Sequence, residues 1–263
     1  MPALENCRKY GRSPFSVAVI HGGPGAAGSV ASVAKELSKS RGVLEPLQTA
    51  STIDGQAMEL HDLLQKNATL PVTLIGHSWG AWLGLIFAAR NPFLVKKLIL
   101  VGCGPMEEKY SEAIIATRLS RLNEEEVKSV LKLTSALNDP SSGNKDAKFG
   151  EFGRLMSIAD SYDLLPGPEP DLVLNEDINR NVWNEAEVLR SRGELLRIAG
   201  NVRCPIVAIH GDYDPHPSEG VEKPLSKHAK DFRFILLKKC GHEPWRERFA
   251  RAKFFEALEK ELA

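Results

Sequence analysis

The hydrophobic positions of this chain fall into short runs that alternate with segments patterned as helices. Runs typical of buried strands occur at residues 16–20, 43–47, 72–75, 98–101, 206–209 and 232–237. Apolar residues recur at helical spacing at residues 29–40, 53–66, 78–90, 221–229 and 245–262. This alternation predicts an α/β fold in which a mostly parallel sheet is covered by helices on both faces.

The alternation stops between residues 104 and 201, where amphipathic runs occur without a convincing strand. One of these runs opens with Asn123 and Glu126, which have the spacing of a capping box. A helical insertion after the strand that ends near Val101 would overhang the carboxyl ends of the strands, where open α/β sheets bind ligands. The sequence therefore predicts a core of residues 1–105 and 202–263 and a helical cap of residues 106–201.

The segment Gly76-His-Ser-Trp-Gly80 lies between a predicted strand and a predicted helix. In such a G-x-S-x-G turn the glycines permit a tight, strained backbone, so that the serine hydroxyl projects from the edge of the sheet. This context makes Ser78 a candidate nucleophile. The alternative is a glycine-rich turn in which Ser78 only caps the following helix.

A second glycine-rich loop, His21-Gly-Gly-Pro-Gly25, follows the strand expected at residues 16–20. Acyl transfer requires donors aimed at the developing oxyanion, and backbone N–H groups serve well where no side chain blocks the approach. Gly23 and Trp79 are the candidates for this oxyanion hole. The imidazole of His21 is expected to be structural and to bind the loop backbone. A nucleotide-phosphate loop is disfavoured, because the chain has no G-K-[ST] sequence.

The strand expected at residues 206–209 leads into Gly211-Asp-Tyr-Asp214, and the last predicted strand leads into Cys240-Gly-His242. The candidate nucleophile, acid and base therefore occur in the order Ser, Asp, His, each just beyond a strand. α/β-Hydrolases have this order, whereas two unrelated folds arrange the same triad differently. On this pattern alone, both Asp212 and Asp214 could supply the acid.

Taken together, these motifs resemble those of α/β-hydrolases, and within that superfamily those of the proline iminopeptidase group. The resemblance rests on the His21 loop, the Ser78 turn, Gly211-x-x-Asp214 and Gly241-His242, and it spans most of the expected core. It implies a catalytic triad of Ser78, Asp214 and His242, because relatives place the acid three residues after the glycine that ends the strand. Asp212 is then a residue that caps the turn.

The chain departs from the iminopeptidase pattern at two places. Those relatives usually have glycine where this chain has His77, which could line the substrate pocket or pack in the core. They also have two more strands before the His21 loop, for which residues 1–15 leave too little chain. We therefore expect an α/β-hydrolase sheet of about six strands that lacks the usual first two. Residues 43–47 would form its edge, where Pro46 limits pairing with foreign strands.

Iminopeptidases bind the ammonium group of their substrate through carboxylates of the cap. The candidates for such a contact here are Glu176, Asp177, Glu185 and Glu187, and the alternative is that these residues form a solvated helix face. The resemblance thus implies a serine hydrolase that cleaves a small ester, thioester, lactone or amide through an acyl-enzyme. An aminopeptidase of the proline iminopeptidase kind is one such enzyme. The alternatives are a carboxylesterase or lactonase without peptidase activity and a non-catalytic ligand-binding protein of the same fold.

Composition argues against several other classes of function. Lys+Arg and Asp+Glu both total 34 and no basic stripe is present, so the expected partner is a small-molecule or short-peptide substrate and not nucleic acid. No run reaches the roughly 20 apolar residues of a membrane helix. Residues 1–10 lack the apolar centre of a signal peptide, so a cytoplasmic protein is expected. The four scattered cysteines and the histidines show no ligand spacing, so neither a metal nor another cofactor is expected.

Overall fold

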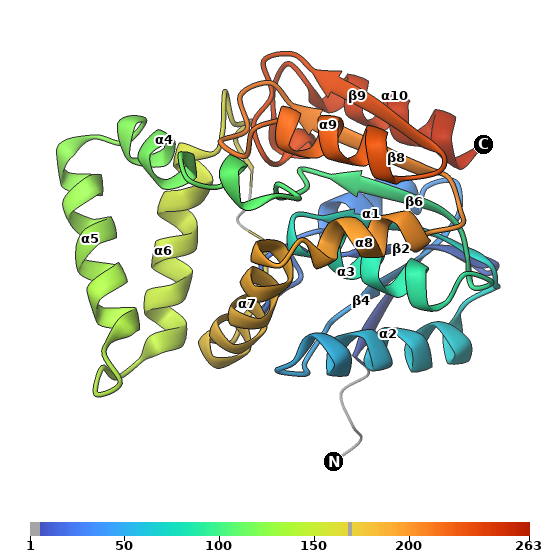
Figure 1. Cartoon of the computed structure of the whole chain (residues 1–263), viewed down its shortest axis with the longest axis horizontal. Coiled ribbons are helices and arrows are strands. Elements are labelled where there is room, and N and C mark those ends of the chain that lie inside the picture. The colour runs from blue at the N-terminus through green and yellow to red at the C-terminus, as the bar shows by residue number, and fades with distance from the viewer. Residues whose placement is uncertain (1–5, 168–169) are drawn as a thin grey trace.

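The computed structural model describes residues 6–167 and 170–263. Residues 1–5, which begin the segment considered for a signal peptide, and residues 168–169, which fall in the expected cap, lie outside the described residues. The described chain forms a seven-stranded sheet between layers of helices, and a group of helices projects from one side (Figure 1).

The main sheet is parallel except at one edge. In spatial order its strands are β1 (Cys7–Tyr10), β4 (Gly42–Pro46), β2 (Phe15–Ile20), β5 (Val72–His77), β6 (Val95–Val101), β8 (Ile206–Gly211) and β9 (Phe232–Leu237). The neighbours from β4 to β9 pair in parallel, whereas β1 pairs antiparallel with β4. The α/β fold and the mostly parallel sheet predicted from the sequence are confirmed.

The expectation that residues 43–47 form the edge of the sheet is wrong. Residues of β1 add a strand outside β4, and Cys7 pairs with Pro46. This strand was missed because Cys-Arg-Lys-Tyr is short and polar and carries no hydrophobic alternation. The exposed Lys9 now lies on the edge strand, where a charged side chain limits pairing with foreign strands.

The helices occupy most of the segments in which the sequence predicted them. Their bounds are α1 (Ala31–Leu37), α2 (Ile53–Asn67), α3 (Trp79–Arg90), α4 (Ile114–Ser120), α5 (Glu124–Asn138), α6 (Lys145–Ala159), α7 (Glu176–Ser191), α8 (Glu194–Asn201), α9 (Glu219–His228) and α10 (Arg251–Leu262), with 3₁₀ turns η1 (Glu108–Tyr110) and η2 (Pro244–Arg246). The capping box at the start of α5 is present, since Asn123 accepts from the Glu126 N–H and Glu126 accepts from the Asn123 N–H.

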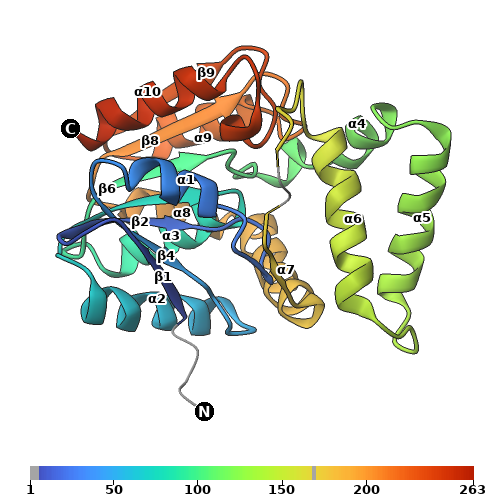
Figure 2. The ribbon, with the colours of Figure 1, turned by 180° about the vertical axis from the view of Figure 1, so that it is seen from behind.

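Two buried clusters lie on opposite faces of the sheet. Helices α2, α3, α8 and α9 cover one face, and α1 and α10 cover the other (Figure 2). Alternate residues of the strands supply the two clusters, as Ala18 and Val19 of β2 illustrate. The α3 helix is apolar all round because it is buried between the sheet and its neighbouring helices. This packing fixes the start of α3, and with it the turn that carries Ser78.

The helical segment expected as a cap has two parts. In α7 and α8, Val182 and Leu195 belong to the main core cluster, so these helices pack on the body of the protein. Helices α4 to α6 form a separate small cluster that includes Val130 and Leu155. A short antiparallel pair, β3 (Ala26–Ala27) and β7 (Val173–Leu174), joins the chain before α7 to the His21 loop region.

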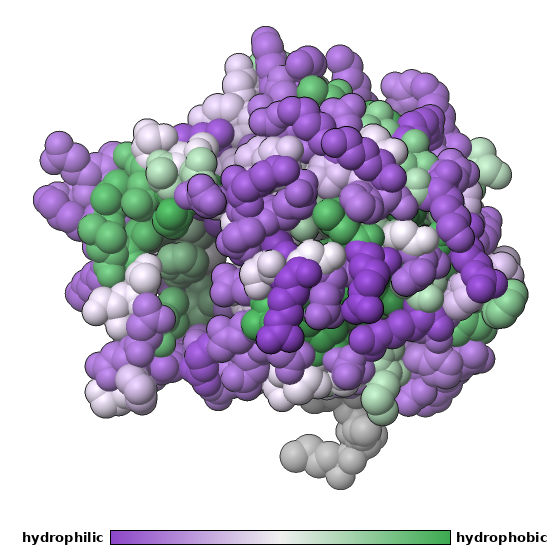
Figure 3. All heavy atoms as spheres, in the orientation of Figure 1, coloured by the Kyte–Doolittle hydropathy of each residue, from purple (hydrophilic) through white to green (hydrophobic). Residues whose placement is uncertain are grey.

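The projecting helices carry exposed apolar side chains. Ile115, Leu131 and Ile158 are between 38% and 59% exposed. Figure 3 shows hydrophobic surface gathered over these helices and a hollow between them and the rest of the molecule. Among the described residues, no helix has both the length and the apolar character needed to cross a membrane.

Candidate active site

Ser78 lies in a strained turn between β5 and α3. Its φ and ψ are 50° and −113°, which is uncommon for a residue with a side chain. The glycines on either side are required by close packing. A Cβ on Gly76 would lie 2.1 Å from the Gly80 oxygen, and a Cβ on Gly80 would lie 2.5 Å from the Ile20 oxygen. The Ser78 side chain makes no capping hydrogen bond to α3, so the alternative of a simple capping serine loses support.

The His21 loop lies directly against this turn. A Cβ on Gly22 would approach Ser78 Cβ to 3.1 Å and His77 Nδ1 to 2.6 Å, so only glycine fits there. His21 is fully buried, and its Nδ1–H donates to the Gly22 oxygen over 2.9 Å. Burial lowers the pKa of His21 to about 4, which keeps the imidazole neutral. The structural role expected for His21 agrees with this geometry.

The two candidate oxyanion donors occupy suitable backbone positions. Gly23 has a φ of 56°, a conformation that glycine adopts readily. Trp79 is the first residue of α3, and the first N–H groups of a helix have no acceptor within it. The indole of Trp79 is buried and donates to Gln56 Oε1 over 2.9 Å, so this side chain packs in the core. The oxyanion hole stays a prediction that rests on these backbone positions.

Asp214, and not Asp212, lies next to His242. The Nδ1 of His242 is 2.7 Å from Asp214 Oδ2, and the Asp214 side chain is completely buried. Asp212 instead accepts a hydrogen bond from the Cys240 N–H and lies 3.7 Å from the Lys238 ammonium. Asp212 therefore holds the loop that carries His242, and Asp214 holds the imidazole itself.

The electrostatics of this pair keep Asp214 ionised and raise the affinity of His242 for a proton. Burial alone would raise the pKa of Asp214, but three nearby histidines, foremost His242, hold that pKa well below its usual range. Burial alone would lower the pKa of His242, but the Asp214 carboxylate outweighs it and raises that pKa. A hydrogen bond from Nδ1 to the carboxylate places the free lone pair on Nε2 when His242 is neutral.

His77 is buried and packs against His242. Its residue exposure is 5%, and its ring lies between those of His242 and Trp245, each at a centroid distance of 4.7 Å. Its Nε2–H donates to the His242 carbonyl over 3.1 Å. His77 is thus in packing contact with the candidate base, and its role in lining the substrate pocket stays a prediction. This contact also shows that the Ser78 turn and the His242 loop are neighbours.

Sequence reasoning missed His216, which is the second imidazole on Asp214. His216 Nδ1 lies 2.7 Å from Asp214 Oδ1, and the His216 backbone N–H donates to the same oxygen over 2.9 Å. An Asp that accepts from the backbone two residues later is an Asx turn, and Asp-Pro-His is a sequence that favours one. That signal could have predicted the backbone contact but not the position of the ring. His210 of β8 is buried and donates to the His216 carbonyl over 2.8 Å.

The end of α6 contacts the His242 loop. The His242 backbone N–H donates to the Asp160 carbonyl over 2.9 Å. The Asp160 carboxylate in turn forms a two-point ion pair with Arg118 of α4, at 2.6 and 2.7 Å. The Gly241 backbone is so close that a Cβ there would lie 2.1 Å from the Asp160 oxygen. Arg118 and Asp160 were not predicted, because nothing local in the sequence relates them to His242.

The acidic residues proposed to bind a substrate ammonium mostly have partners within the protein. Glu185 Oε2 accepts from the Ile53 N–H over 2.8 Å and so satisfies the start of α2. Glu176 and Asp177 both pair with Arg180 on the next turn of α7. Glu187 is exposed. Their role in substrate binding stays a prediction, and the structure gives three of them structural contacts.

Asp214, His216 and His242 also offer one ligand atom each within 4.8 Å of one another. Two imidazoles and a carboxylate can bind a divalent metal. Here, however, both Nδ1 atoms are hydrogen-bonded to the carboxylate at 2.7 Å, so a metal ion would have to displace both protons. As a three-ligand set that includes both Nδ1 atoms, these groups are therefore already engaged with one another.

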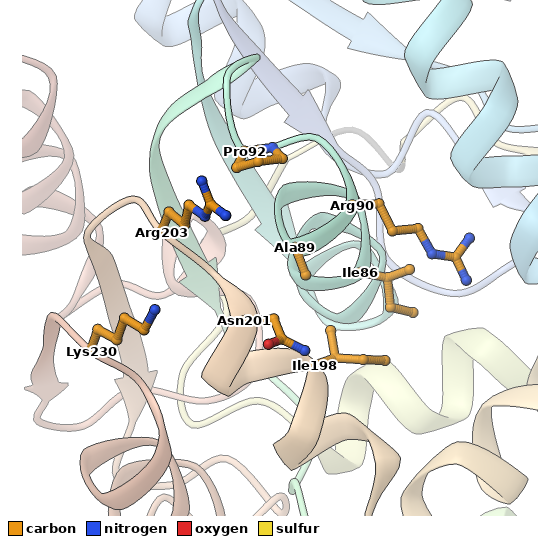
Figure 4. Close-up of a pocket in the computed structure, with 8 residues that line it drawn as sticks. All are labelled: Ile86, Ala89, Arg90, Pro92, Ile198, Asn201, Arg203 and Lys230. Carbon is orange, nitrogen blue, oxygen red and sulfur yellow. The ribbon is translucent and has the colours of Figure 1, made fainter.

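A separate surface pocket of about 360 Å³ lies at the other end of α3 (Figure 4). Its lining residues are Ile86, Ala89, Arg90, Pro92, Ile198, Asn201, Arg203 and Lys230. Ser78 precedes the first residue of the 12-residue α3 helix, which is about 18 Å long. This pocket is therefore distinct from the candidate active site.

Comparison with known proteins agrees with this fold. The alpha/beta hydrolase family matches residues 20–256. The chain belongs to this family. The protein is thus an α/β-hydrolase, and the fold class and family resemblance predicted from the sequence are confirmed. No curated protein sequence matches the chain.

Solved structures of several hydrolases resemble the chain at low sequence identity. VinJ is 20% identical with a TM-score of 0.70, and the match covers 97% of this chain and 93% of that one. A putative lipase from Acinetobacter baumannii AYE is 17% identical, with a TM-score of 0.64 and coverage of 97% and 87%. The proline iminopeptidase of Mycobacterium smegmatis is 18% identical, with a TM-score of 0.62 and coverage of 97% and 93%. At these identities the likeness shows the fold alone.

Proposed function

We propose that this hydrolase cleaves a small ester, thioester, lactone or amide through a Ser78–His242–Asp214 triad and an acyl-enzyme. The observation that carries the proposal is the 2.7 Å hydrogen bond from His242 Nδ1 to the buried Asp214, beside a serine held in a strained strand-to-helix turn. A serine hydroxyl needs an adjacent base to be nucleophilic near neutral pH. His242, with its Nδ1 proton bound to Asp214, is oriented as such a base.

In the proposed reaction, Ser78 Oγ attacks the substrate carbonyl while His242 Nε2 takes the hydroxyl proton. The backbone N–H groups of Gly23 and Trp79 stabilise the negative oxygen of the tetrahedral intermediate. His242 then gives its proton to the leaving group as that bond breaks, which leaves the acyl group on Ser78. Water, deprotonated by His242, attacks the acyl-enzyme, and the acid product leaves as Ser78 recovers its proton. Asp214 stabilises the imidazolium in both half-reactions and stays ionised.

Two observations favour an ester or thioester over a peptide as the substrate. The acidic side chains Glu176, Asp177 and Glu185 are already engaged by Arg180 or by a backbone N–H, so they are poor candidates for binding an ammonium. The projecting helices α4 to α6 instead present exposed apolar residues. We therefore infer a carboxylesterase-type activity first, and an aminopeptidase activity of the kind named in the Mycobacterium smegmatis structure second.

The test is labelling with a fluorophosphonate probe, which reacts with activated serines, followed by assay on short p-nitrophenyl esters and on prolyl and alanyl arylamides. Ser78→Ala should lose labelling and hydrolysis of every substrate, with a loss of several orders of magnitude in kcat. Ser129→Ala, on α5, where the hydroxyl donates to the Glu125 carbonyl, is the matched control and should behave as wild type. Labelling that survives in Ser78→Ala would assign the nucleophile to another residue.

A further inference from the structure

The carboxylate of Asp214 has two imidazole partners, but the proposed reaction uses only one of them. Oδ2 lies 2.7 Å from His242 Nδ1, whereas Oδ1 lies 2.7 Å from His216 Nδ1 and 2.9 Å from the His216 backbone nitrogen. The Asp214 side chain is 0% exposed, so solvent does not supply further donors. Its two oxygens are thus divided between the two hydrogen-bonded rings, and a third imidazole, that of His210, faces Oδ2 with its Nε2 3.6 Å away.

The protonation states follow from the chemistry of the carboxylate. An ionised carboxylate only accepts hydrogen bonds, so both Nδ1 atoms must carry protons. Burial lowers the pKa of His216 to about 4, against the opposing effect of Asp214. At neutral pH His216 is therefore a neutral donor that does not compete with His242 for the role of base. The pKa of His242 is raised, so the two rings differ although they share one acid.

The surroundings of His216 hold it in this state. The His210 Nε2–H donates to the His216 carbonyl, which fixes the backbone beside Asp214. The ring of His216 lies 4.6 Å from that of His242, and Arg118 of α4 disfavours a positive charge on His216. Asp160 compensates Arg118 through its ion pair, and His77 contacts the far imidazole, His242. A second proton on His216 would thus be opposed by His242 and Arg118 and favoured by Asp214, while Asp160 is engaged by Arg118.

We propose that His216 is a positioning residue whose neutral Nδ1–H binds the second oxygen of Asp214 and limits how strongly this carboxylate increases the basicity of His242. The inference rests on the proposed function, in which His242 is the base. Donors to a carboxylate stabilise its charge and weaken its interaction with any other partner. A base works best when its pKa is near the operating pH, and a carboxylate bound to His242 alone would hold the imidazolium too firmly.

Two variants of similar size separate this role from simple packing. His216→Leu removes the donor, and His216→Asn keeps an N–H near the position of Nδ1. In His216→Leu, the acidic limb of the kcat/KM profile for a p-nitrophenyl ester should move to higher pH by about half a unit to one unit. In His216→Asn, the limb should stay at its wild-type position. His61→Leu, at an exposed histidine on α2, is the control and should change neither the rate nor the limb.

An NMR titration gives the same comparison without turnover. The pKa of the His242 imidazole should rise in His216→Leu and not in His216→Asn, and the downfield N–H resonance of His216 should be missing in both. If the leucine variant does not fold, His216→Phe keeps the ring volume without the donor. An unshifted His242 in the variant without a donor, or equal shifts in both variants, would overturn the inference. Absence of wild-type hydrolysis and labelling would instead reject the proposed function, while the NMR result still decides the role of His216.

Discussion

The imidazole of His77 lies against that of His242, and its Nε2–H donates to the backbone carbonyl of the same residue over 3.1 Å. The residue before the candidate nucleophile thus holds the loop that carries the candidate base. The bond also fixes the tautomer of His77, because a carbonyl can only accept, and it leaves Nδ1 facing Gly22. Burial, followed by repulsion from His242, lowers the pKa of His77 well below its usual range, so the ring stays neutral.

His77→Gly, which restores the residue usual in iminopeptidases, should therefore lower kcat with little change in KM. We expect a loss of about tenfold, since a neutral hydrogen bond contributes roughly 0.5–1.5 kcal/mol and the ring contact is lost as well. Steady-state kinetics on an ester measure this split. His77→Gln, which can still donate to the carbonyl, should recover part of kcat. A rise in KM alone would show that His77 contacts substrate after all.

Asp214→Asn should reduce kcat by about 10⁴-fold, because the amide cannot hold His242 in the tautomer with a free Nε2. Asp212→Asn should lose far less, since Asp212 accepts only from the Cys240 backbone and pairs weakly with Lys238. Both variants are assayed on the same ester, with thermal unfolding as the control for folding. Inactivity of the Asp212 variant alone would reverse the assignment of the acid.

Glu185→Gln and Glu187→Gln should differ in stability and not in substrate binding. Glu185 accepts from the first N–H of α2, where a negative charge also interacts favourably with the helix dipole, so its replacement should cost about 1 kcal/mol. Glu187 is exposed and its replacement should be nearly neutral. Thermal unfolding and KM for free-amine arylamides measure the two effects. An increase in KM for arylamides, but not for neutral esters, would restore the aminopeptidase hypothesis.

The buried neutral histidines should make the protein less stable in acid. His21 has a pKa lowered to about 4 by burial, whereas the unfolded residue titrates near 6.5. Between these values the unfolded chain binds a proton that the folded chain does not, so stability falls as pH falls through this window, by roughly 3 kcal/mol at pH 4 for one such residue. His216 acts in the same direction, and His242, with its raised pKa, opposes it.

Urea unfolding of wild type and His21→Asn between pH 7.5 and 4.5 checks this expectation. The asparagine cannot take up the proton, so the variant should lose stability less steeply with acid than wild type. Parallel curves for the two proteins would mean that His21 does not contribute to the acid sensitivity.

Local patterns were enough to predict the fold and to place Ser78, His242 and the Asp212–Asp214 turn, whereas the choice of Asp214 over Asp212 came from the family resemblance. Each of these residues follows a strand whose apolar run is visible in the sequence, and parallel strands bring their carboxyl ends to one edge. The polar edge strand β1 was missed, because its pairing with β4 is decided by tertiary contacts and not by its own pattern.

The partners of the candidate base were harder to predict. His216 approaches Asp214 through a turn whose side-chain direction the sequence does not specify, and Asp160 reaches His242 only through the packing of α6. The acidic cap residues were considered for substrate binding because they are charged. In the structure, the Glu185 carboxylate instead accepts a hydrogen bond from the backbone N–H of Ile53, which is distant in the sequence.

The hydrogen bond from the His242 N–H to the Asp160 carbonyl has a consequence for engineering this protein. Helices α4 to α6 look like an interchangeable module, because they have their own small apolar cluster. Asp160, however, directly follows the last residue of α6 and contacts the loop of the candidate base, and Gly241 leaves no room for that loop to shift. A chimaera that imports these helices from another hydrolase must therefore bring its own histidine loop with them, so the two segments form a single unit of exchange.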